Sequence, residues 1–333
     1  MELAVGALLH SLVGGATAAV VTWVLGRRRR LLSYVRGRPE WSVRRVWDTG
    51  LPQWRIVLGT VQTESADHPA LAQTEVSAGV KIAHFLGRWL PEQIPVTEAM
   101  VPCRDDPDIA CCNVLRIVIG GPVHNSASAD RNRRWLEPEA KAPVAMGFVG
   151  MDGAQTLRLM RKLAERESRP ARPEFADRER QLLLDPVRRS LGAGAQTARP
   201  LVTQRWLAGE AYPAEWKDWA VCARSRRMQP LDGGASAEVL AFGLRHAGTA
   251  AIGNELVKPA GHVLRELAHC GMDDWVAVVQ FSGTRRNYAV DWIRVYRLAR
   301  ETGKELDSWE RQVSGCGGRL SDDGADLSGA PEA

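Results

Sequence analysis

The sequence predicts an α/β protein in which an N-terminal transmembrane helix precedes a mostly parallel sheet with helices on both faces and an antiparallel C-terminal hairpin. Three observations carry this prediction. The chain opens on an apolar segment, glycine-terminated apolar runs alternate with helical periodicity in its middle, and two strand-like segments lie close together near its end. The 333 residues are enough to bury a sizeable core.

The segment at residues 3–25 contains no Asp, Glu, Lys or Arg. As a helix it would span about 35 Å, which exceeds a hydrocarbon core of about 30 Å. A cleaved signal peptide carries its positive charge before the apolar run, whereas here only Glu2 precedes it and basic residues follow it. We therefore expect an uncleaved single-pass anchor in the cell membrane. Because flanking basic residues stay on the cytoplasmic side, the C-terminal domain should be cytoplasmic.

A basic juxtamembrane linker is expected over residues 26–50. Besides the lipid bilayer itself, anionic lipid headgroups are expected partners, each basic residue near the membrane contributing about 1 kcal/mol. A simply solvated linker is the alternative. The cluster that carries this expectation comprises Arg27, Arg28, Arg29 and Arg30.

Two further partner predictions follow from the sequence. Ser11, Gly15 and Ala19 recur at four-residue spacing, which favours a homodimer through the span, although small residues are common in membrane helices generally. No nucleic acid is expected, because the body of the chain has no stripe of Lys and Arg interleaved with aromatics despite a net charge of +5.

The first half of the cytoplasmic part alternates strands with helices. Apolar runs at residues 54–60, 114–121 and 143–150 read as buried strands. Helices are expected between and after them, one at 154–166 and one whose apolar face comprises Val76, Val80, Ala83, Leu86 and Leu90. Strands that alternate with helices in this way favour a parallel sheet covered on both faces.

The second half predicts an extension of that sheet. A polar, proline-bearing break at 168–174 marks a possible subdivision of the domain over 51–310, and a helix is expected over 175–190. A disordered acidic tail is expected over 311–333. Strands are predicted at 219–225, 239–246, 275–283 and 288–298, the last two forming a hairpin.

Four strand ends carry glycine and polar residues, at 59–68, 120–128, 150–153 and 245–255. In an open α/β sheet, ligands bind in the crevice outside the carboxyl ends of the strands. The sequence therefore predicts a ligand site there. The candidate ligand-binding residues are Gly59, Thr60, Gly120, Gly121, His124, Asn125, Ser126, Gly248 and Thr249.

The stretch at 120–128, GGPVHNSAS, has two interpretations. Glycines permit close backbone approach, and amides at the start of the helix that follows could receive an anion such as a phosphate. Alternatively, Asn125, Ser126 or Ser128 only caps that helix, which is worth about 1 kcal/mol. Thr249 has the same alternative. No G-x-G-x-x-G or P-loop pattern occurs, so the sequence identifies no cofactor, and no metal site is predicted.

Catalytic candidates are few. Glu64 and His124 follow two predicted strands, with Asp67 and His68 nearby, and a His and a carboxylate could share acid–base work. Exposed loop carboxylates are more often only solvated. No established hydrolase or kinase motif occurs, so the sequence leaves open whether the protein is an enzyme.

The order of an N-terminal span, an Arg cluster, GGPVHN, LRHAGTAAIGNEL and DWVAVVQFSG resembles uncharacterised actinobacterial single-pass membrane proteins with a Rossmann-like cytoplasmic domain. The resemblance covers residues 55–283 and implies a Rossmann-like fold, without an activity to carry over. The strand and glycine layout is also similar to nucleotide- or sugar-binding modules of bacterial signalling and defence.

Three function hypotheses follow. The first is a membrane-tethered module that binds a small phosphorylated or nucleotide-like ligand, with a sensor as one form of such a module. The second is a nucleotide or glycosyl-bond hydrolase that uses a His and carboxylate pair. The third is a non-catalytic membrane scaffold that recruits a protein partner, which exposed Trp206, Trp216 and Trp219 would favour.

Overall fold

The computed structural model describes most of the chain beyond residue 38. The described residues are 39–61, 70–71, 73–103, 113–137, 142–151, 155–156, 158–159, 179–184, 199–204, 215–228, 235–284, 287–300, 302–313 and 317–319. The expected transmembrane helix, Arg27 to Arg30 and the subdivision at 168–174 lie outside them. Within the described ranges no helix is long and apolar enough to cross a membrane.

A mixed sheet forms the centre of the molecule, in the order β13-β12-β11-β9-β10-β5-β1-β4. Its parallel half pairs β5 with β10 and with β1, and β1 with β4. Its antiparallel half contains β9, β11, β12 and β13, with β14 also paired to β12. The parallel strands are β1 (Gln53–Leu58), β4 (Ile94–Pro102), β5 (Val114–Ile119) and β10 (Ala235–Gly243). The antiparallel strands are β9 (Glu215–Met228), β11 (Asp274–Thr284), β12 (Asn287–Leu298), β13 (Glu305–Gln312) and β14 (Gly317–Arg319).

The parallel strands reverse their order at one place. From β1 the chain passes through α3 (Gln73–Trp89) to β4 on one side, whereas β5 lies on the other side of β1. Such a reversal is a topological switch point, where the connections diverge and leave a crevice outside the carboxyl ends of the two strands. The crevice of this protein therefore lies between the ends of β1 and β5.

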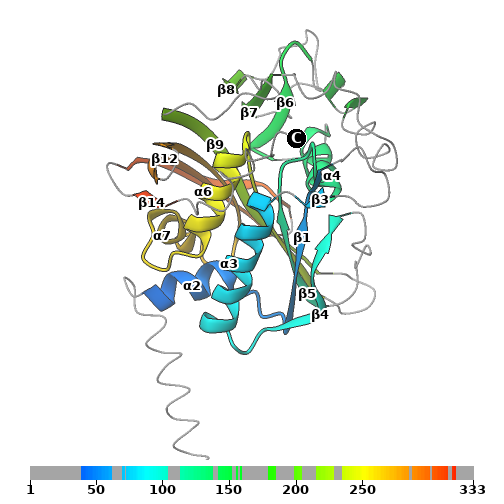
Figure 1. Cartoon of the computed structure of the whole chain (residues 1–333), viewed down its shortest axis with the longest axis vertical. Helices are drawn as coiled ribbons and strands as arrows, with labels where there is room; N and C mark the ends of the chain where they lie inside the picture. Colours follow the sequence, from blue (N-terminus) through cyan, green and yellow to red (C-terminus); the bar gives the residue numbers. More distant parts are fainter. Residues whose placement is uncertain are drawn as a thin grey trace, which may run out of the picture.

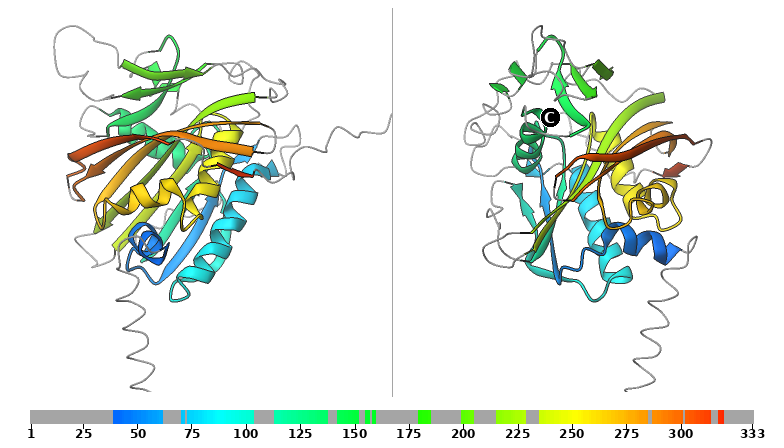
Figure 2. Two further views of the ribbon diagram at one scale, coloured as in Figure 1. Left: turned by 90° about the vertical axis from the view of Figure 1, so that its left-hand side faces the viewer. Right: turned by 180° about the vertical axis from the view of Figure 1, so that it is seen from behind.

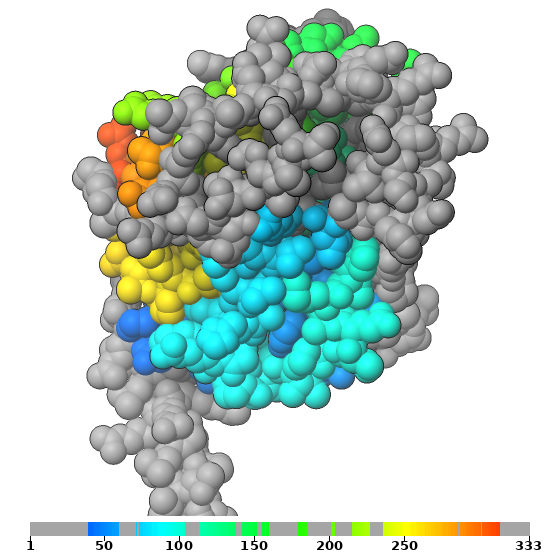
Figure 3. Space-filling model, in the orientation of Figure 1, coloured from blue at the N-terminus to red at the C-terminus, as the bar shows by residue number. Residues whose placement is uncertain are grey.

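Four helices cover one face of the sheet: α2 (Pro39–Trp47), α3, α6 (His246–Leu256) and α7 (His262–Ala268). They pack as pairs, α3 beside α6 and α2 beside α7 (Figure 1). Figure 3 shows α3 and β4, in cyan, at the surface of this side of the molecule. Alternate strand residues such as Ile56, Ile117 and Val239 point into this core, as expected for strands covered on both faces.

The opposite face is covered by α4 (Ser126–Leu136) and by a small antiparallel sheet (Figure 2). The intervening strand residues, among them Val57, Val118 and Leu240, pack against Met146 and Leu182 of that sheet. Its strands are β6 (Val144–Phe148), β7 (Arg180–Leu184) and β8 (Arg199–Gln204), and a two-stranded sheet of β2 (Thr60–Val61) and β3 (Ala70–Leu71) is separate.

A buried arginine fixes the first described helix to the sheet. Arg224 of β9 is 1% exposed and donates to four backbone carbonyls, those of Arg45, Val46, Gly271 and Asp273, at 2.6–2.9 Å. Burial lowers the pKa of Arg224 to about 9, and the carbonyls compensate part of the lost hydration. The guanidinium thus joins the end of α2 to the turn before β11.

The α/β class and the antiparallel hairpin of β11 and β12 are confirmed. Parallel pairing is confirmed for the half of the sheet that contains β10, β5, β1 and β4. The strand predicted at 143–150 is confirmed, but its placement in the parallel sheet is wrong. It is β6 of the small antiparallel sheet, since it pairs with β7.

Three other expectations are corrected by the described residues. Residues 180–184, inside the helix expected over 175–190, form strand β7 because they pair with both β6 and β8. Residues 39–47 of the expected linker form helix α2, whose Val43, Val46 and Trp47 are fully buried. Strand pairing also includes residues 311–312 and 317–319 of the expected tail.

Candidate functional site

The crevice between β1 and β5 is occupied by a carboxyl group of the chain itself. Gly59 follows β1 and Gly120 follows β5, and the side chain of Glu75 extends from the first turn of α3 to lie between them. The Gly59 amide donates to Glu75 Oε2 at 2.6 Å. A Cβ at Gly59 would lie 2.5 Å from the same oxygen and 2.9 Å from the carbonyl oxygen of His124. The two glycines are therefore what makes room for the carboxyl.

Burial controls the protonation of Glu75. The side chain is 3% exposed, and loss of hydration raises its pKa from 4.5 to about 8, while the hydrogen bond from Gly59 opposes the shift. Glu75 therefore holds a proton at neutral pH. A protonated carboxyl can donate a hydrogen bond as well as accept one, which is uncommon for a glutamate in a protein.

Gly120 is the second position at the crevice that requires a glycine. Its φ of +113° is a conformation that L side chains rarely adopt, and a Cβ there would overlap the Glu75 carboxyl. Gly121 lies beside the end of β10, with the Gly243 carbonyl 3.7 Å from where its Cβ would be. The sequence singled out both glycines, and the structure places them at the rim of the crevice.

The polar residues after these glycines start helix α4. Asn125 is its N-cap, and the side-chain oxygen accepts from the amides of Ala127 and Ser128 at 3.0 and 3.2 Å. The Asn125 amide group donates to the carbonyls of Ile119 and Val57, and Ser126 Oγ donates to the Cys103 carbonyl at 3.4 Å. The capping interpretation of this stretch is confirmed for Asn125, which is 1% exposed.

His124 has a different environment. Its ring is stacked on that of His246, the first residue of α6, with centroids 6.4 Å apart and planes inclined by 19°. Burial, with the nearby charge of Arg180, lowers the pKa of His124 to about 4 and also lowers that of His246. Both rings are therefore neutral at pH 7, and both are only partly buried.

Arg180 brings a cation from the small sheet to this edge of the large one. Its Nη1 donates to the Leu244 carbonyl, just after β10, at 2.9 Å. Burial lowers its pKa to about 10, and the negative charge of Asp218 opposes that shift. Arg180 remains positively charged at neutral pH, since the shifted pKa still lies about three units higher.

Asp218 of β9 organises the start of α6. The N-cap residue, Arg245, makes no side-chain capping bond. Instead Asp218, fully buried, accepts from the amides of Trp219, Arg245 and Gly248 at 2.7–3.0 Å. Burial raises its pKa to about 6 although the three amides lower it. The Asp218 carboxylate thus fixes the start of α6, whose first residue is His246.

The two predicted residues of α6 have structural contacts. Gly248 lies against Asp218, whose Oδ2 would be 2.6 Å from a Cβ at that position. Thr249 is inside the helix rather than its cap, and its Oγ1 accepts from the Gly243 amide at 2.8 Å and donates to the Arg245 carbonyl at 3.3 Å. These contacts hold α6 to the end of β10.

Other predicted residues are not brought to this edge by the described structure. Glu64, Asp67 and His68 lie outside the described residues, and so does the side chain of Thr60. The predicted loop at 150–153 follows β6, and its first residue, Gly150, has a φ of +74° with no atom within 4 Å of where a Cβ would lie. Among the described residues, no group of three or more His, Cys, Asp or Glu is placed to hold a metal ion.

Sequence reasoning missed Glu75, Asp218 and Arg180. The apolar face expected for α3 is confirmed at Leu86 and Leu90, which are buried, and at Val76 and Ala83, which pack against the core, whereas Val80 is 53% exposed. The other buried residues of the helix are Glu75, Ala78, Gly79, Ile82 and Phe85. Glu75 is therefore the first residue of the buried face of α3, about one turn before Ala78 and Gly79. Its position on this face is the sequence pattern that could have identified it.

Comparison with models of protein families, with curated proteins and with solved structures found no match to this chain.

Proposed function

We propose that the α/β domain binds a small phosphorylated or nucleotide-like ligand at the carboxyl ends of β5 and β10, next to the crevice that Glu75 fills. The observation that carries the proposal is the buried cation of Arg180, whose charge acts on both His124 and His246. A guanidinium supplies a donor and a charge suited to phosphate.

The charges of the neighbouring groups are compatible with an anion. Glu75 is protonated at neutral pH and so does not repel a phosphate, and the two histidines are held neutral by burial and by Arg180. A bound anion would offset the repulsion from Arg180 and favour the imidazolium form. Binding is therefore expected to take up protons, and affinity should be higher at pH 6 than at pH 8.

The test is calorimetric titration of the full-length chain with inorganic phosphate, AMP and glucose 6-phosphate at pH 6 and pH 8. We expect saturable binding of at least one of them, tighter at pH 6. Replacing both His124 and His246 by Gln should weaken the pH dependence relative to the wild type, while the ionisation of Glu75 near pH 8 and of the ligands themselves remains. The matched control is His84→Gln on the exposed side of α3. Absence of binding by all three compounds, or a pH dependence that is the same in the wild type and the double variant, would refute the proposal.

A second candidate function is hydrolysis of a nucleotide or glycosyl bond by acid–base catalysis, now with Glu75 rather than Glu64 as the carboxyl partner of His124. It is favoured by the opposite pKa shifts of these groups: Glu75 keeps a proton to donate and His124 keeps a free nitrogen to accept one. A mechanism with two carboxylates is less favoured, because Asp218 is fully buried and accepts from three amides.

The enzyme hypothesis predicts turnover that depends on both groups. Phosphate release from nucleoside triphosphates and hydrolysis of nitrophenyl glycosides should be measured with the wild type, Glu75→Gln and His124→Gln. Loss of turnover in both variants, with unchanged thermal unfolding, is expected if they are the catalysts. Retained activity in either variant would exclude the pair.

Tethering by residues 3–25, with the domain in the cytoplasm, is part of the proposal. Removal of that segment should release the protein from the membrane fraction, and a C-terminal reporter should be active only in the cytoplasm.

The scaffold alternative needs exposed tryptophans. Trp216 is 5% exposed, Trp219 packs edge-on against Trp292, and Trp206 lies outside the described residues, so the described part supplies no such surface.

A further inference from the structure

A cavity lies at the opposite end of the sheet from Glu75. It has a volume of about 300 Å³ and lies between α4 and the loop that follows β12. On β9, Asp218 lies near the carboxyl ends of the parallel strands and Ser225 lies at this cavity. The two residues are seven positions apart along the strand, which corresponds to about 24 Å. The two places are therefore distinct. Apolar side chains of four neighbouring strands contribute to the lining, namely Ala223, Leu240, Val276 and Leu298.

Arginines from three elements line this cavity. Arg131 and Arg134 come from α4, Arg300 from the loop after β12, and Arg224 and Arg226 from β9. The guanidinium groups of Arg224 and Arg226 are bound to backbone carbonyls at the end of α2, on the other face of the sheet. The charges that remain at the cavity are those of Arg131, Arg134 and Arg300 against Glu238 and Asp274, an excess of one positive charge. Such an excess beside apolar side chains attracts an anion that also has an apolar part.

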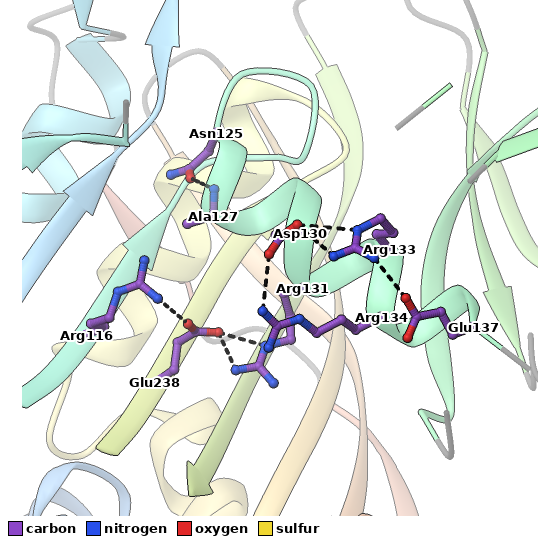
Figure 4. A network of polar contacts seen from close by, with 9 residues as sticks. All are labelled: Arg116, Asn125, Ala127, Asp130, Arg131, Arg133, Arg134, Glu137 and Glu238. Carbon is purple, nitrogen blue, oxygen red and sulfur yellow. Dashed lines mark hydrogen bonds and ion pairs between the residues drawn. The ribbon is translucent and has the colours of Figure 1, made fainter. Parts of the chain in front are cut away.

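The two carboxylates already have partners. Glu238 binds Arg116 at 3.1 Å and Arg131 at 2.6 Å, as the close view in Figure 4 shows. Asp274 accepts the backbone amide of Arg226 at 3.0 Å. The contacts of Glu238 fix the position of Arg131, whereas the charge of Asp274 also acts on Arg226 and Arg300.

Two of the lining arginines can be drawn into a ligand contact at little cost. Arg134 pairs with Asp130 at 3.2 Å, but the two side chains are 41% and 47% exposed, and pairs this exposed contribute little. Arg300 is exposed and donates through Nε to the Met272 carbonyl at 2.6 Å. Guanidinium groups recognise carboxylates and phosphates through two parallel donors, so both residues suit an anionic group.

We propose that this cavity binds a small organic anion, with its carboxylate or phosphate on Arg134 and Arg300 and its apolar part on Leu240, Val276 and Leu298. The volume is at the lower end of the range for small-molecule sites, which fits a ligand with about one ring. Glu238 keeps Arg131 in place beside it.

The experiment is calorimetric titration of the full-length chain with phenyl phosphate, benzoate, inorganic phosphate and benzyl alcohol. The test variant carries Arg134→Gln and Arg300→Gln. The matched control is Arg133→Gln, on the same helix, which pairs with Asp130 and Glu137 and does not line the cavity. We expect phenyl phosphate or benzoate to bind, at least about tenfold more weakly to the double variant and unchanged to the control.

Each outcome decides a part of the proposal. Whichever of phenyl phosphate and benzoate binds more tightly identifies the charged group that the cavity prefers. Absence of saturation by both at about 10 mM would overturn the proposal, since such affinity is below that of a specific site. Equal affinity of benzyl alcohol would refute the role of charge, and equal affinity of inorganic phosphate the role of the apolar lining. Binding of phenyl phosphate or benzoate that is unchanged in the double variant would place the anion elsewhere, for example beside Arg180, and would also count against the proposal.

Discussion

The buried carboxyl of Glu75 predicts a specific change in stability with pH. In Glu75→Gln the amide oxygen can still accept the hydrogen bond from Gly59, and the side chain keeps its volume between Gly59 and Gly120. The substitution therefore removes only the ionisation. No proton has to be lost from the folded variant when the pH rises.

The magnitude follows from the pKa of the folded state. Because folding raises the pKa of Glu75 from 4.5 to about 8, the folded chain holds a proton that the unfolded chain releases in this interval. The wild type is therefore favoured below pH 4.5 and loses stability as the pH rises to 8. A shift of this size corresponds to at most about 5 kcal/mol at 1.4 kcal/mol for each pH unit, and relaxation around the charged form reduces it.

The assay is urea unfolding of the full-length wild type and variant at a series of pH values from 5 to 9. The stability of Glu75→Gln relative to the wild type should increase by at least about 2 kcal/mol across the series. Glu98→Gln, on the exposed face of β4, is the matched control and should run parallel to the wild type. If the difference between Glu75→Gln and wild type is constant with pH, the carboxyl is not buried as described.

Three further predictions concern the same region and the fold. Gly120→Ala should lose about 2 kcal/mol or more in thermal unfolding, because it combines a positive φ with a Cβ that overlaps the Glu75 carboxyl; Gly50→Ala, with positive φ and open space, should lose only about 1 kcal/mol. Arg224→Met should lower the free energy of unfolding in urea by about 3–5 kcal/mol, since four carbonyls lose their donor. A variant as stable as the wild type would show that Arg224 does not hold α2 to the turn before β11. In NMR spectra the ring of His124 should stay neutral from pH 7 to about 5. Its lowered pKa gives stability that is present above pH 6.5 and lost as the pH falls to 4, so a titration near pH 6.5 would contradict its burial.

Local patterns predicted the strands that are buried on both faces. β5 is apolar apart from Arg116, and β11 contains the apolar run Trp275–Val279; such runs arise where helices or a second layer cover both faces. The antiparallel hairpin of β11 and β12 was predictable for the same reason, because two long strands lie within a few residues of each other. The rim glycines Gly59 and Gly120 were predictable because they directly end such runs.

Long-range pairing explains most of what sequence reasoning missed. The short apolar run at Arg180–Leu184 fits a helix or a strand, and pairing with β6 and β8 decides the outcome. The same pairing carries Arg180 to the end of β10. Asp218 is separated from the helix it caps by 27 residues or more, so no local pattern connects it to Arg245 or Gly248.

The helix phase explains the remaining omission. The predicted face of α3 included the exposed Val80 and omitted Ala78, Gly79 and Ile82, through which α3 packs against α6 and the sheet. Small residues permit this close approach: a Cβ on Gly253 of α6 would lie 2.7 Å from that of Ala78. Apolar periodicity alone does not register such a contact, and it therefore did not single out Glu75.

The central claim, an anion site beside Arg180 and the two histidines, is tested most directly by histidine NMR of the full-length chain. The resonances of His124 and His246 should be followed from pH 4 to 8 without ligand and with inorganic phosphate or AMP. We expect a bound phosphate group to move both resonances and to raise the pKa of His124 from its value of about 4. Resonances and pKa values unchanged by about 10 mM of either compound would contradict the account.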